Sequence, residues 1–373
     1  MRVRRKDKVV ESIENHLEET KSITPKESSR VEFLNSGSTL LNLAISGSSK
    51  GGWARGRVNN VVGDKSCGKS LLSLDLCANT FYTIKKTPSK LYPRIRNAHI
   101  VYDNVEGVMD FKLEQMYGKE FVDNVEWIRS GTCEEFGRNY LSRVKNLVKG
   151  DFLLYVIDSM DSLISQAGRE RMEKSLNSDK DEEASYGTEK AKYLSNKFFG
   201  NCCDLMQGKD ATLLCVSQVR ENLNAGMFGK KHYRVGGKAM DFYTQVVVWL
   251  YGGEKLKETI NGKKMVYGNS VIAKVEKNKC GIAFRDAEFP ILYNNGISYI
   301  DDIGSLIKFL NPKATAKQCE QMLDDFYEEG IFSHKKYEEY KLLAEQEWVK
   351  TEKKLSERTK RPNKFELLGL RES

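Results

Sequence analysis

Apolar residues along this chain alternate between short, nearly continuous runs and longer stretches in which they recur every three or four positions. Six runs rich in Val, Ile, Leu and aromatic residues indicate β-strands, at residues 57–63, 98–103, 152–158, 211–218, 245–251 and 270–279. Strand patterns that alternate with helical patterns are typical of a parallel sheet joined by crossover helices. The pattern therefore predicts an α/β core with a twisted, mostly parallel sheet.

The two ends of the chain follow a helical pattern instead. Near the start, a polar and basic stretch carries apolar residues at helical spacing, namely Val9, Val10, Ile13 and Leu17. Near the end, a second apolar stripe comprises Tyr337, Tyr340, Ala344 and Trp348. Because an isolated short helix is marginal in water, the first should dock on a core or a neighbour. We expect three parts: residues 1–34 as a helical arm for subunit docking, 35–303 as the core, and 304–373 as a small, mainly helical domain.

Two long segments inside the core, about residues 166–190 and 219–238, are rich in glycine or charge and lack an apolar pattern. Loops of that length in a compact domain are usually functional or unstructured. The basic residues of the second segment are Arg220, Lys230, Lys231, Arg234 and Lys238, against the single acid Glu221. Phe228 and Tyr233 are interleaved with them. Cations pair with phosphates and flat rings stack on bases, so this segment indicates contact with nucleic acid.

Overall composition adds little to this picture. The 373 residues include 60 Lys and Arg against 52 Asp and Glu, a net charge of +8, which is a mild excess in favour of an anionic partner. No stretch approaches the roughly 18 apolar residues of a membrane helix, and no secretory signal is visible at the start. Eight cysteines include no CxxC pair, which favours reduced thiols over a zinc site or disulfides. We expect a protein without membrane contact.

Residues 63–70, "GDKSCGKS", match the pattern G-x-x-x-x-G-K-[ST] between an apolar run and a helical pattern, which is the context of a phosphate-binding loop. Its residues are Gly63, Asp64, Lys65, Ser66, Cys67, Gly68, Lys69 and Ser70. The glycines let backbone N–H groups wrap phosphates, Lys69 supplies a cation to the outer phosphates, and the Ser70 hydroxyl binds Mg²⁺. The motif predicts a nucleotide and a magnesium ion as cofactors.

Three carboxylates follow predicted strands and complete this chemistry. Asp158 ends an apolar run and is predicted to hold Mg²⁺ together with Ser70. Hydrolysis also needs a carboxylate that polarises the attacking water, and the candidates are Asp103, which ends the strand at residues 98–103, and Glu106, which follows it. Chemistry alone does not choose between these two.

The order of these motifs resembles the RecA family of recombinases over about residues 35–300. The matching segments are "NSGSTLLNLAISG" with "GGWARGRVNNVVGDKSCGKS", "VEGVMD", "VIDSMDSL", "CVSQVREN", "MFG" with "GGKAMDFY", and "KVEKNKCGIAFRDAEFPILYNNGI". The resemblance implies a RecA-like ATPase core that binds ATP and Mg²⁺ through the phosphate-binding loop and Asp158. It also places Asp110, at the end of "VEGVMD", among the nucleotide contacts.

The same resemblance assigns catalytic roles. Glu106 corresponds to the family's catalytic glutamate, although this chain has one more residue between Asp103 and that glutamate than the family has. Gln218 corresponds to the glutamine that senses the γ-phosphate at the root of the second DNA-binding loop. Lys277 and Lys279 correspond to two lysines that reach the ATP of a neighbouring subunit, so they would act together with Lys69.

Contacts with DNA are implied for both loops. The residues are Tyr186, Lys190 and Lys192 near the end of the first loop, and Arg220, Phe228, Lys230, Lys231, Arg234, Gly236 and Gly237 in the second. The resemblance also gives Phe228 a place in a subunit contact. The segment "DDFYEEGIF" and the helix predicted after it are similar to the tail of phage recombinases, so the resemblance implies a bacterial or phage-infected bacterial cytoplasm.

These features predict an ATP-dependent recombinase that forms a helical filament on single-stranded DNA, pairs it with double-stranded DNA and exchanges strands, with DNA-stimulated ATP hydrolysis. Single-strand-binding and loader proteins are expected partners. The alternatives are a RecA-like hexameric helicase or branch-migration ATPase, a P-loop small-molecule kinase, and a non-catalytic ATP-binding regulator. A kinase would turn over ATP without regard to DNA.

Overall fold

The computed structural model describes residues 31–85, 92–176, 186–221, 232–234, 237–328 and 330–361. The chain separates into two units, Met1–Glu32 and Phe33–Ser373, and all described helices and strands belong to the second. The helix predicted within residues 1–30 lies outside the described residues.

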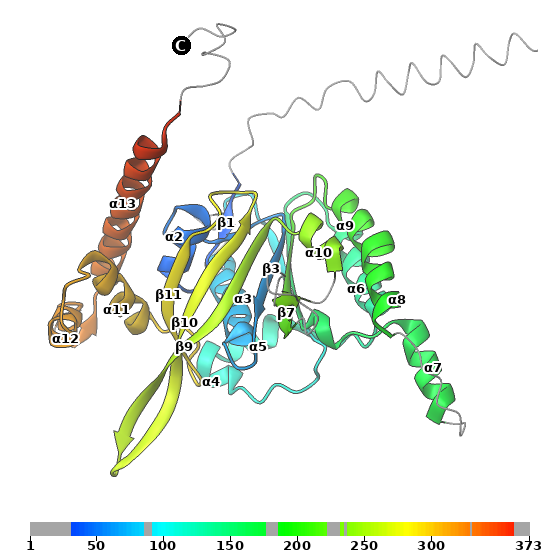
Figure 1. The fold of residues 1–373 in the computed structure, drawn as a ribbon, viewed down its shortest axis with the longest axis horizontal. Coiled ribbons are helices and arrows are strands. Elements are labelled where there is room, and N and C mark those ends of the chain that lie inside the picture. The colour runs from blue at the N-terminus through cyan, green and yellow to red at the C-terminus, as the bar shows by residue number, and fades with distance from the viewer. Residues whose placement is uncertain are drawn as a thin grey trace, which may run out of the picture. The chain divides into compact units, whose positions relative to one another are not determined.

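The second unit is built on one large sheet with strand order β11-β10-β9-β3-β7-β6-β4-β5 (Figure 1). Its strands are β3 (Val58–Gly63), β4 (Asn97–Asn104), β5 (Glu126–Ile128), β6 (Asp151–Asp158), β7 (Ala211–Glu221), β9 (Val246–Ile260), β10 (Lys263–Asn278) and β11 (Asp286–Leu292). Pairing from β9 through β3 to β5 is parallel, and β9, β10 and β11 pair antiparallel. The short strand β8 (His232–Arg234) pairs antiparallel with β7. The predicted α/β fold and its six strands, which correspond to β3, β4, β6, β7, β9 and β10, are confirmed.

Helices connect and cover these strands. They are α2 (Thr39–Ser46), α3 (Lys69–Lys85), α4 (Leu113–Tyr117), α5 (Lys119–Asn124), α6 (Cys133–Asn146), the 3-10 turn η1 (Met160–Ser162), α7 (Gln166–Leu176), α8 (Tyr186–Tyr193), the π-helical segment η2 (Leu194–Phe198), α9 (Phe199–Leu205), α10 (Gly237–Tyr243), α11 (Tyr299–Leu310), α12 (Ala316–Asp324) and α13 (His334–Thr359). Small two-stranded sheets pair β1 (Phe33–Leu34) with β2 (Trp53–Ala54), and β12 (Tyr327–Glu328) with β13 (Ile331–Phe332). Within the described residues, none of these helices combines the length and apolarity needed to cross a bilayer.

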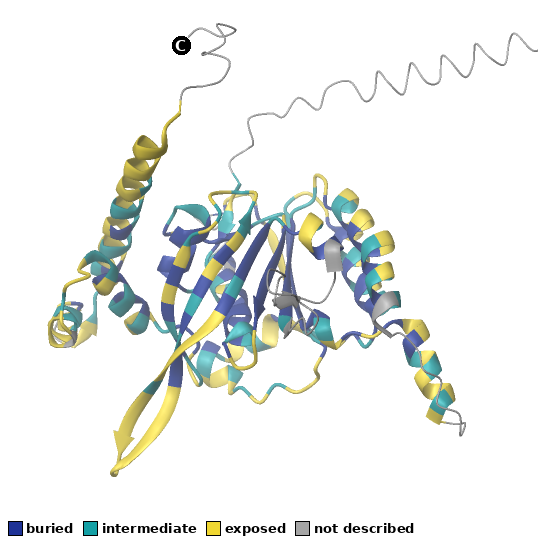
Figure 2. Ribbon diagram, viewed as in Figure 1, coloured by how far each residue is buried: buried dark blue, intermediate teal, exposed yellow. Residues whose placement is uncertain are grey.

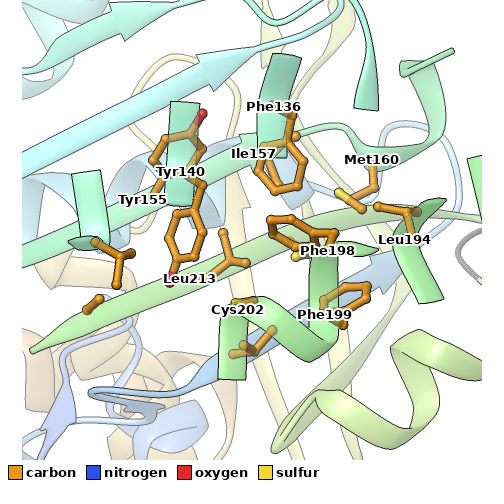
Figure 3. Packing of buried hydrophobic residues seen from close by; sticks show 14 of the residues in the cluster. Phe136, Tyr140, Tyr155, Ile157, Met160, Leu194, Phe198, Phe199, Cys202 and Leu213 are labelled. Atoms are coloured by element: carbon orange, nitrogen blue, oxygen red, sulfur yellow. The ribbon is translucent and has the colours of Figure 1, made fainter. Parts of the chain in front are cut away.

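An aromatic core holds α6, η2 and α9 against β6 and β7 (Figure 3). Phe136 of α6 packs on Phe198 of η2 with ring centroids 4.7 Å apart, and Tyr155 of β6 packs on Phe136 and Tyr140 of α6. Helix α6 presents this face because its apolar residues recur at helical spacing, and the Thr132 side chain caps its start by accepting from the Glu135 N–H. The core therefore fixes the two strands, β6 and β7, that end in Asp158 and near Gln218.

The helices at the C-terminal end pack on the same unit. Asp302 of α11 is fully buried and accepts hydrogen bonds from the Thr39 N–H and hydroxyl at 2.8 and 2.6 Å and from the Tyr337 hydroxyl at 2.7 Å. The predicted stripe on α13 is confirmed, since Tyr337 and Ala344 are buried and Trp348 packs against Phe309. The boundary predicted at residues 303/304 falls inside α11.

Strands β9 and β10 continue past the sheet as a two-stranded ribbon whose end is exposed (Figure 2). They span 15 and 16 residues, whereas the sequence predicted only residues 245–251 and 270–279. The outer halves bury neither face, and apart from the short group Met265, Val266 and Tyr267 they lack the apolar run from which a buried strand could be predicted.

Candidate active site

The loop between β3 and α3 has the shape of a phosphate cradle. Gly68 has a φ of +90°, and a Cβ atom there would lie 2.5 Å from Cδ1 of Ile291. A Cβ on Gly63 would lie 2.4 Å from the Cys67 Sγ. Both positions therefore require glycine, and the loop leads directly into the N-terminus of the 17-residue helix α3, where backbone N–H groups and the helix dipole favour an anion.

Lys69, Ser70 and Asp158 converge beside this loop. The half-buried Lys69 ammonium donates to the Asp64 carbonyl at 2.7 Å. The Ser70 hydroxyl hydrogen-bonds Asp158, which also accepts from the Tyr102 hydroxyl at 2.7 Å. Burial raises the pKa of Asp158, and the hydrogen bonds from Ser70 and Tyr102 oppose that rise. A hydroxyl and a carboxylate next to a phosphate cradle are the donor set expected for Mg²⁺, so these residues fit the ion.

The carboxyl ends of the parallel strands bring four predicted residues to one edge of the sheet. Gly63 pairs in register with Gln218, and Asn104 pairs with Asp158, so β3, β4, β6 and β7 end together. Ligands bind at this edge in open α/β sheets. The residue assigned to catalysis, Glu106, follows β4 at the same edge.

The structure separates the two carboxylates that the sequence left open. Asp103 is fully buried and accepts from the Ser130 N–H and hydroxyl at 2.7 and 2.6 Å and from the Tyr155 hydroxyl at 2.6 Å. Glu106 is exposed. The Glu106 Oε1 accepts from the hydroxyls of Ser159 and Ser162 at 3.1 and 3.2 Å and from the Gln218 Nε2 at 3.2 Å. Only Glu106 is thus accessible to a water molecule.

Gln218 joins this site to the second loop. Its backbone N–H donates to Asp161 Oδ2 at 2.7 Å, while its side chain donates to Glu106. In the next residues β7 pairs with β8, with Val219 opposite Arg234, so Gln218 stands at the base of a hairpin. The second loop therefore emerges directly from a residue in contact with Glu106.

A cavity of about 470 Å³ continues from the phosphate-binding loop toward β11. Beyond Ser66, Gly68, Lys69, Ser70 and Leu71, it is lined by Phe111, Lys255, Asn269, Ile291 and Tyr293. The Lys255 ammonium and the Tyr293 hydroxyl both donate to the Asn269 Oδ1 at 3.0 Å. Sequence reasoning did not identify these five further residues, although Tyr293 lies in the quoted segment "ILYNNG". The exposed Asp110 precedes Phe111, so it lies next to the cavity.

Lys277 and Lys279 lie at the opposite edge of the sheet. Lys277 pairs with Val247, which pairs with Asn60, three residues before Gly63 on β3. Two strand spacings and three residues separate it from the loop, about 10 Å in each direction. Its ammonium donates to the Asp241 carbonyl of α10, while Lys279 is exposed. Neither lysine meets the phosphate-binding loop of its own chain.

The structure describes only some of the residues predicted to contact DNA. Phe228, Lys230, Lys231 and Gly236 lie outside the described residues, and only the backbone is described for Tyr186, Arg220, Arg234 and Gly237. Lys192 is exposed on α8. Lys190, by contrast, is 6% exposed, and its ammonium donates to the carbonyls of Met160, Asp161 and Leu163. The charge of Lys190 thus points into the protein in this structure, and its contact with DNA stays a prediction.

Comparison with known proteins places this geometry in a family. A family model described as the RecA N-terminal domain matches residues 7–298. Protein RecA of Streptomyces ambofaciens is 30% identical over 269 residues, which is 72% of this chain and 63% of that protein. Protein RecA of Leptospira biflexa serovar Patoc is 27% identical over 271 residues, 72% of this chain and 61% of that protein. The chain thus matches less than two thirds of the length of these relatives. Because the family model covers most of its residues, the chain belongs to the RecA family.

Proposed function

We propose that this protein is an ATP-dependent recombinase that assembles on single-stranded DNA, hydrolyses ATP in response to it, and pairs and exchanges strands with homologous double-stranded DNA. The observation that carries the proposal is the hydrogen bond between Glu106 and Gln218, since it joins the hydrolysis site to the base of the second loop. The relatives are named RecA, and the proposed setting is a bacterial or phage-infected bacterial cytoplasm.

ATP would occupy the cradle and the adjoining cavity. The backbone of residues 63–70 and the Lys69 ammonium would hold its phosphates, and Ser70 with Asp158 would hold Mg²⁺. The bound ion would neutralise charge on the phosphate oxygens. Asp110 and the cavity residues would surround the nucleoside, since the cavity extends from the loop toward them.

Glu106 would polarise the attacking water, and Gln218 would report the state of the nucleotide. In the structure the Gln218 amide donates to Glu106. If this amide turned to a γ-phosphate, the Glu106 carboxylate would lose one donor and become a better acceptor for water, while the base of the loop would move with Gln218. By linkage, DNA that stabilises the loop would then also favour ATP binding.

Lys277 and Lys279 would serve the site of a neighbouring protomer. Their place at the far edge of the sheet keeps them from their own phosphate-binding loop, and a head-to-tail assembly brings opposite edges of adjacent protomers together. Cations supplied in trans would stabilise charge in phosphoryl transfer, as arginine fingers do. Hydrolysis would therefore depend on assembly.

The test is ATPase activity with and without single-stranded DNA, with electron microscopy of the same samples. We expect DNA to raise the rate of hydrolysis and helical filaments to form with ATP. Equal rates with and without DNA, from a protein that stays monomeric, would overturn the proposal. Discrete hexameric rings would favour the helicase alternative instead. Single-strand-binding and loader proteins are proposed as further partners, to be tested by their effect on the lag before hydrolysis.

A further inference from the structure

Lys190 carries a buried charge that has no role in the mechanism proposed above. An ammonium has three N–H donors, and removing it from water is costly unless they are satisfied. The carbonyls of Asp161 and Leu163 accept at 3.0 and 2.9 Å, and the carbonyl of Met160 is the third acceptor. All three belong to one short stretch, the turn η1 with the residue after it.

That turn also holds the two residues proposed for hydrolysis and sensing. The Ser162 hydroxyl donates to Glu106 Oε1 at 3.2 Å, and Asp161 Oδ2 accepts from the Gln218 N–H at 2.7 Å. The Met160 side chain is anchored in the aromatic core (Figure 3). The Lys190 ammonium therefore binds the backbone of the turn η1, and the side chains of this turn position both Glu106 and Gln218.

The residue next to Lys190 joins the helices on the two sides of the first loop. Glu189 of α8 pairs with the Arg171 guanidinium of α7 and accepts from the Ser165 hydroxyl at 3.0 Å. The hydrogen bonds from Arg171 hold the pKa of Glu189 below its usual value. Helices α7 and α8 precede and follow residues 177–185 of the predicted first loop. A change in the position of either helix would therefore also shift Lys190.

We propose that Lys190 is a positioning residue that couples the first DNA-binding loop to ATP hydrolysis, by fixing the turn that aligns Glu106 and Gln218. This inference rests on the proposed function, because it needs DNA to stimulate hydrolysis. It gives Lys190 a role different from that of the exposed Lys192, which stays a proposed phosphate contact on the same helix.

The experiment compares Lys190→Met with the wild type and with Lys209→Met. Methionine keeps most of the length of lysine but removes the donors. Lys209 is a matched control, because its ammonium also donates to a backbone carbonyl, that of Leu147, and it lies just before the start of β7, at the edge away from the site. We expect Lys190→Met to lower kcat at saturating DNA by about 2- to 30-fold, with the KM for ATP and the salt dependence of DNA binding unchanged. Lys209→Met should match the wild type.

A second variant covers the case in which Lys190→Met does not fold. Ser162→Ala removes a single hydroxyl at the other end of the same connection and should produce the same defect in kcat. In the double variant the two effects should fall short of their sum, since both act through one turn. Thermal unfolding of each variant monitors structural loss.

The outcomes separate this inference from the proposed function. If DNA fails to stimulate the wild type, the proposed function fails and this inference with it. If DNA stimulates the wild type, Lys190→Met and Ser162→Ala to the same extent, the recombinase proposal stands and the coupling role of Lys190 is refuted. A weaker DNA affinity of Lys190→Met with normal kcat at saturation would likewise overturn it and restore Lys190 as a DNA contact.

Discussion

Two carboxylates three positions apart, Asp103 and Glu106, do different work because of their surroundings. Asp103 accepts three hydrogen bonds in the interior and holds β4 to Ser130 and Tyr155. Glu106 is exposed at the rim of the phosphate site. We therefore expect Asp103 to contribute to stability, whereas Glu106 is the residue proposed for catalysis.

Substituting each by its amide tests this division. Glu106→Gln should lower ATP turnover by roughly 100-fold or more while ATP binding persists, since a positioned base contributes that much. Asp103→Asn should cost about 1–3 kcal/mol of unfolding free energy, because a buried donor loses its acceptor, and should keep most activity below its melting temperature. ATPase assays and denaturant titration measure both. Normal turnover in Glu106→Gln would remove it from catalysis.

Asp75 of α3 gives the protein a pH-dependent stability. It is 4% exposed and accepts from the Ile297 N–H at 2.9 Å, and burial raises its pKa to about 8. Between its unfolded pKa of 3.8 and about 8, the folded state holds a proton that the unfolded state has released. This group alone therefore makes stability fall as pH rises through that window, by up to about 1.4 kcal/mol per pH unit.

Asp75→Asn should remove that contribution, because an amide does not titrate. We expect the unfolding free energy of the variant to change less between pH 5 and pH 8 than that of the wild type. Denaturant titrations across this range measure the difference. Identical slopes in the two proteins would show that Asp75 keeps an ordinary pKa.

At the scale of elements, one buried carboxylate joins three helices. Asp302 of α11 accepts from Thr39, at the start of α2, and from Tyr337 of α13. Burial raises the pKa of Asp302, and these hydrogen bonds oppose the rise. The attachment of α13 to the core thus depends partly on one tyrosine hydroxyl.

Tyr337→Phe should destabilise the protein by about 1.5–3 kcal/mol, the range for a hydrogen bond to a charged group. Tyr340→Phe is the matched control on the same helix, because the Tyr340 ring packs on Phe326 and its hydroxyl makes no hydrogen bond to the described part of the chain. Thermal and denaturant unfolding compare the two. Equal stability of both variants would mean that packing alone holds α13.

At the scale of the whole molecule, the two edges of the sheet carry complementary halves of the proposed ATP site. The phosphate cradle and Glu106 lie at one edge, and Lys277 with Lys279 at the other. Under the proposed function, a protomer of this kind would complete its sites by head-to-tail association.

Mixing two inactive variants tests this arrangement. Glu106→Gln alone and Lys277→Ala with Lys279→Ala alone should both hydrolyse ATP poorly on DNA. In a 1:1 mixture, random head-to-tail assembly should restore about a quarter of the sites, each with an intact Glu106 from one protomer and intact lysines from its neighbour. The DNA-stimulated ATPase rate of the mixture measures this recovery. Activity no higher than the mean of the separate variants would exclude lysines that act in trans.

The sequence by itself determined the strands of the core and the phosphate-binding loop. Strands buried on both faces are mostly apolar along their length, so β3, β4, β6, β7 and the inner parts of β9 and β10 were visible as runs. The phosphate-binding loop consists of eight consecutive residues, so a local sequence pattern is enough to identify it. The order of these motifs was enough to predict the RecA family, which the family model confirms.

Only the tertiary structure decided which polar side chains meet. Gln218 contacts Glu106 across 112 positions of the chain, and Lys190 turns inward onto a segment 27 to 30 residues before it. The cavity beside the cradle is lined by Lys255 and Asn269, which lie on β9 and β10 outside the runs predicted as strands. Burial and hydrogen-bond partners depend on contacts between distant residues, and a local pattern of residue types carries no record of those contacts.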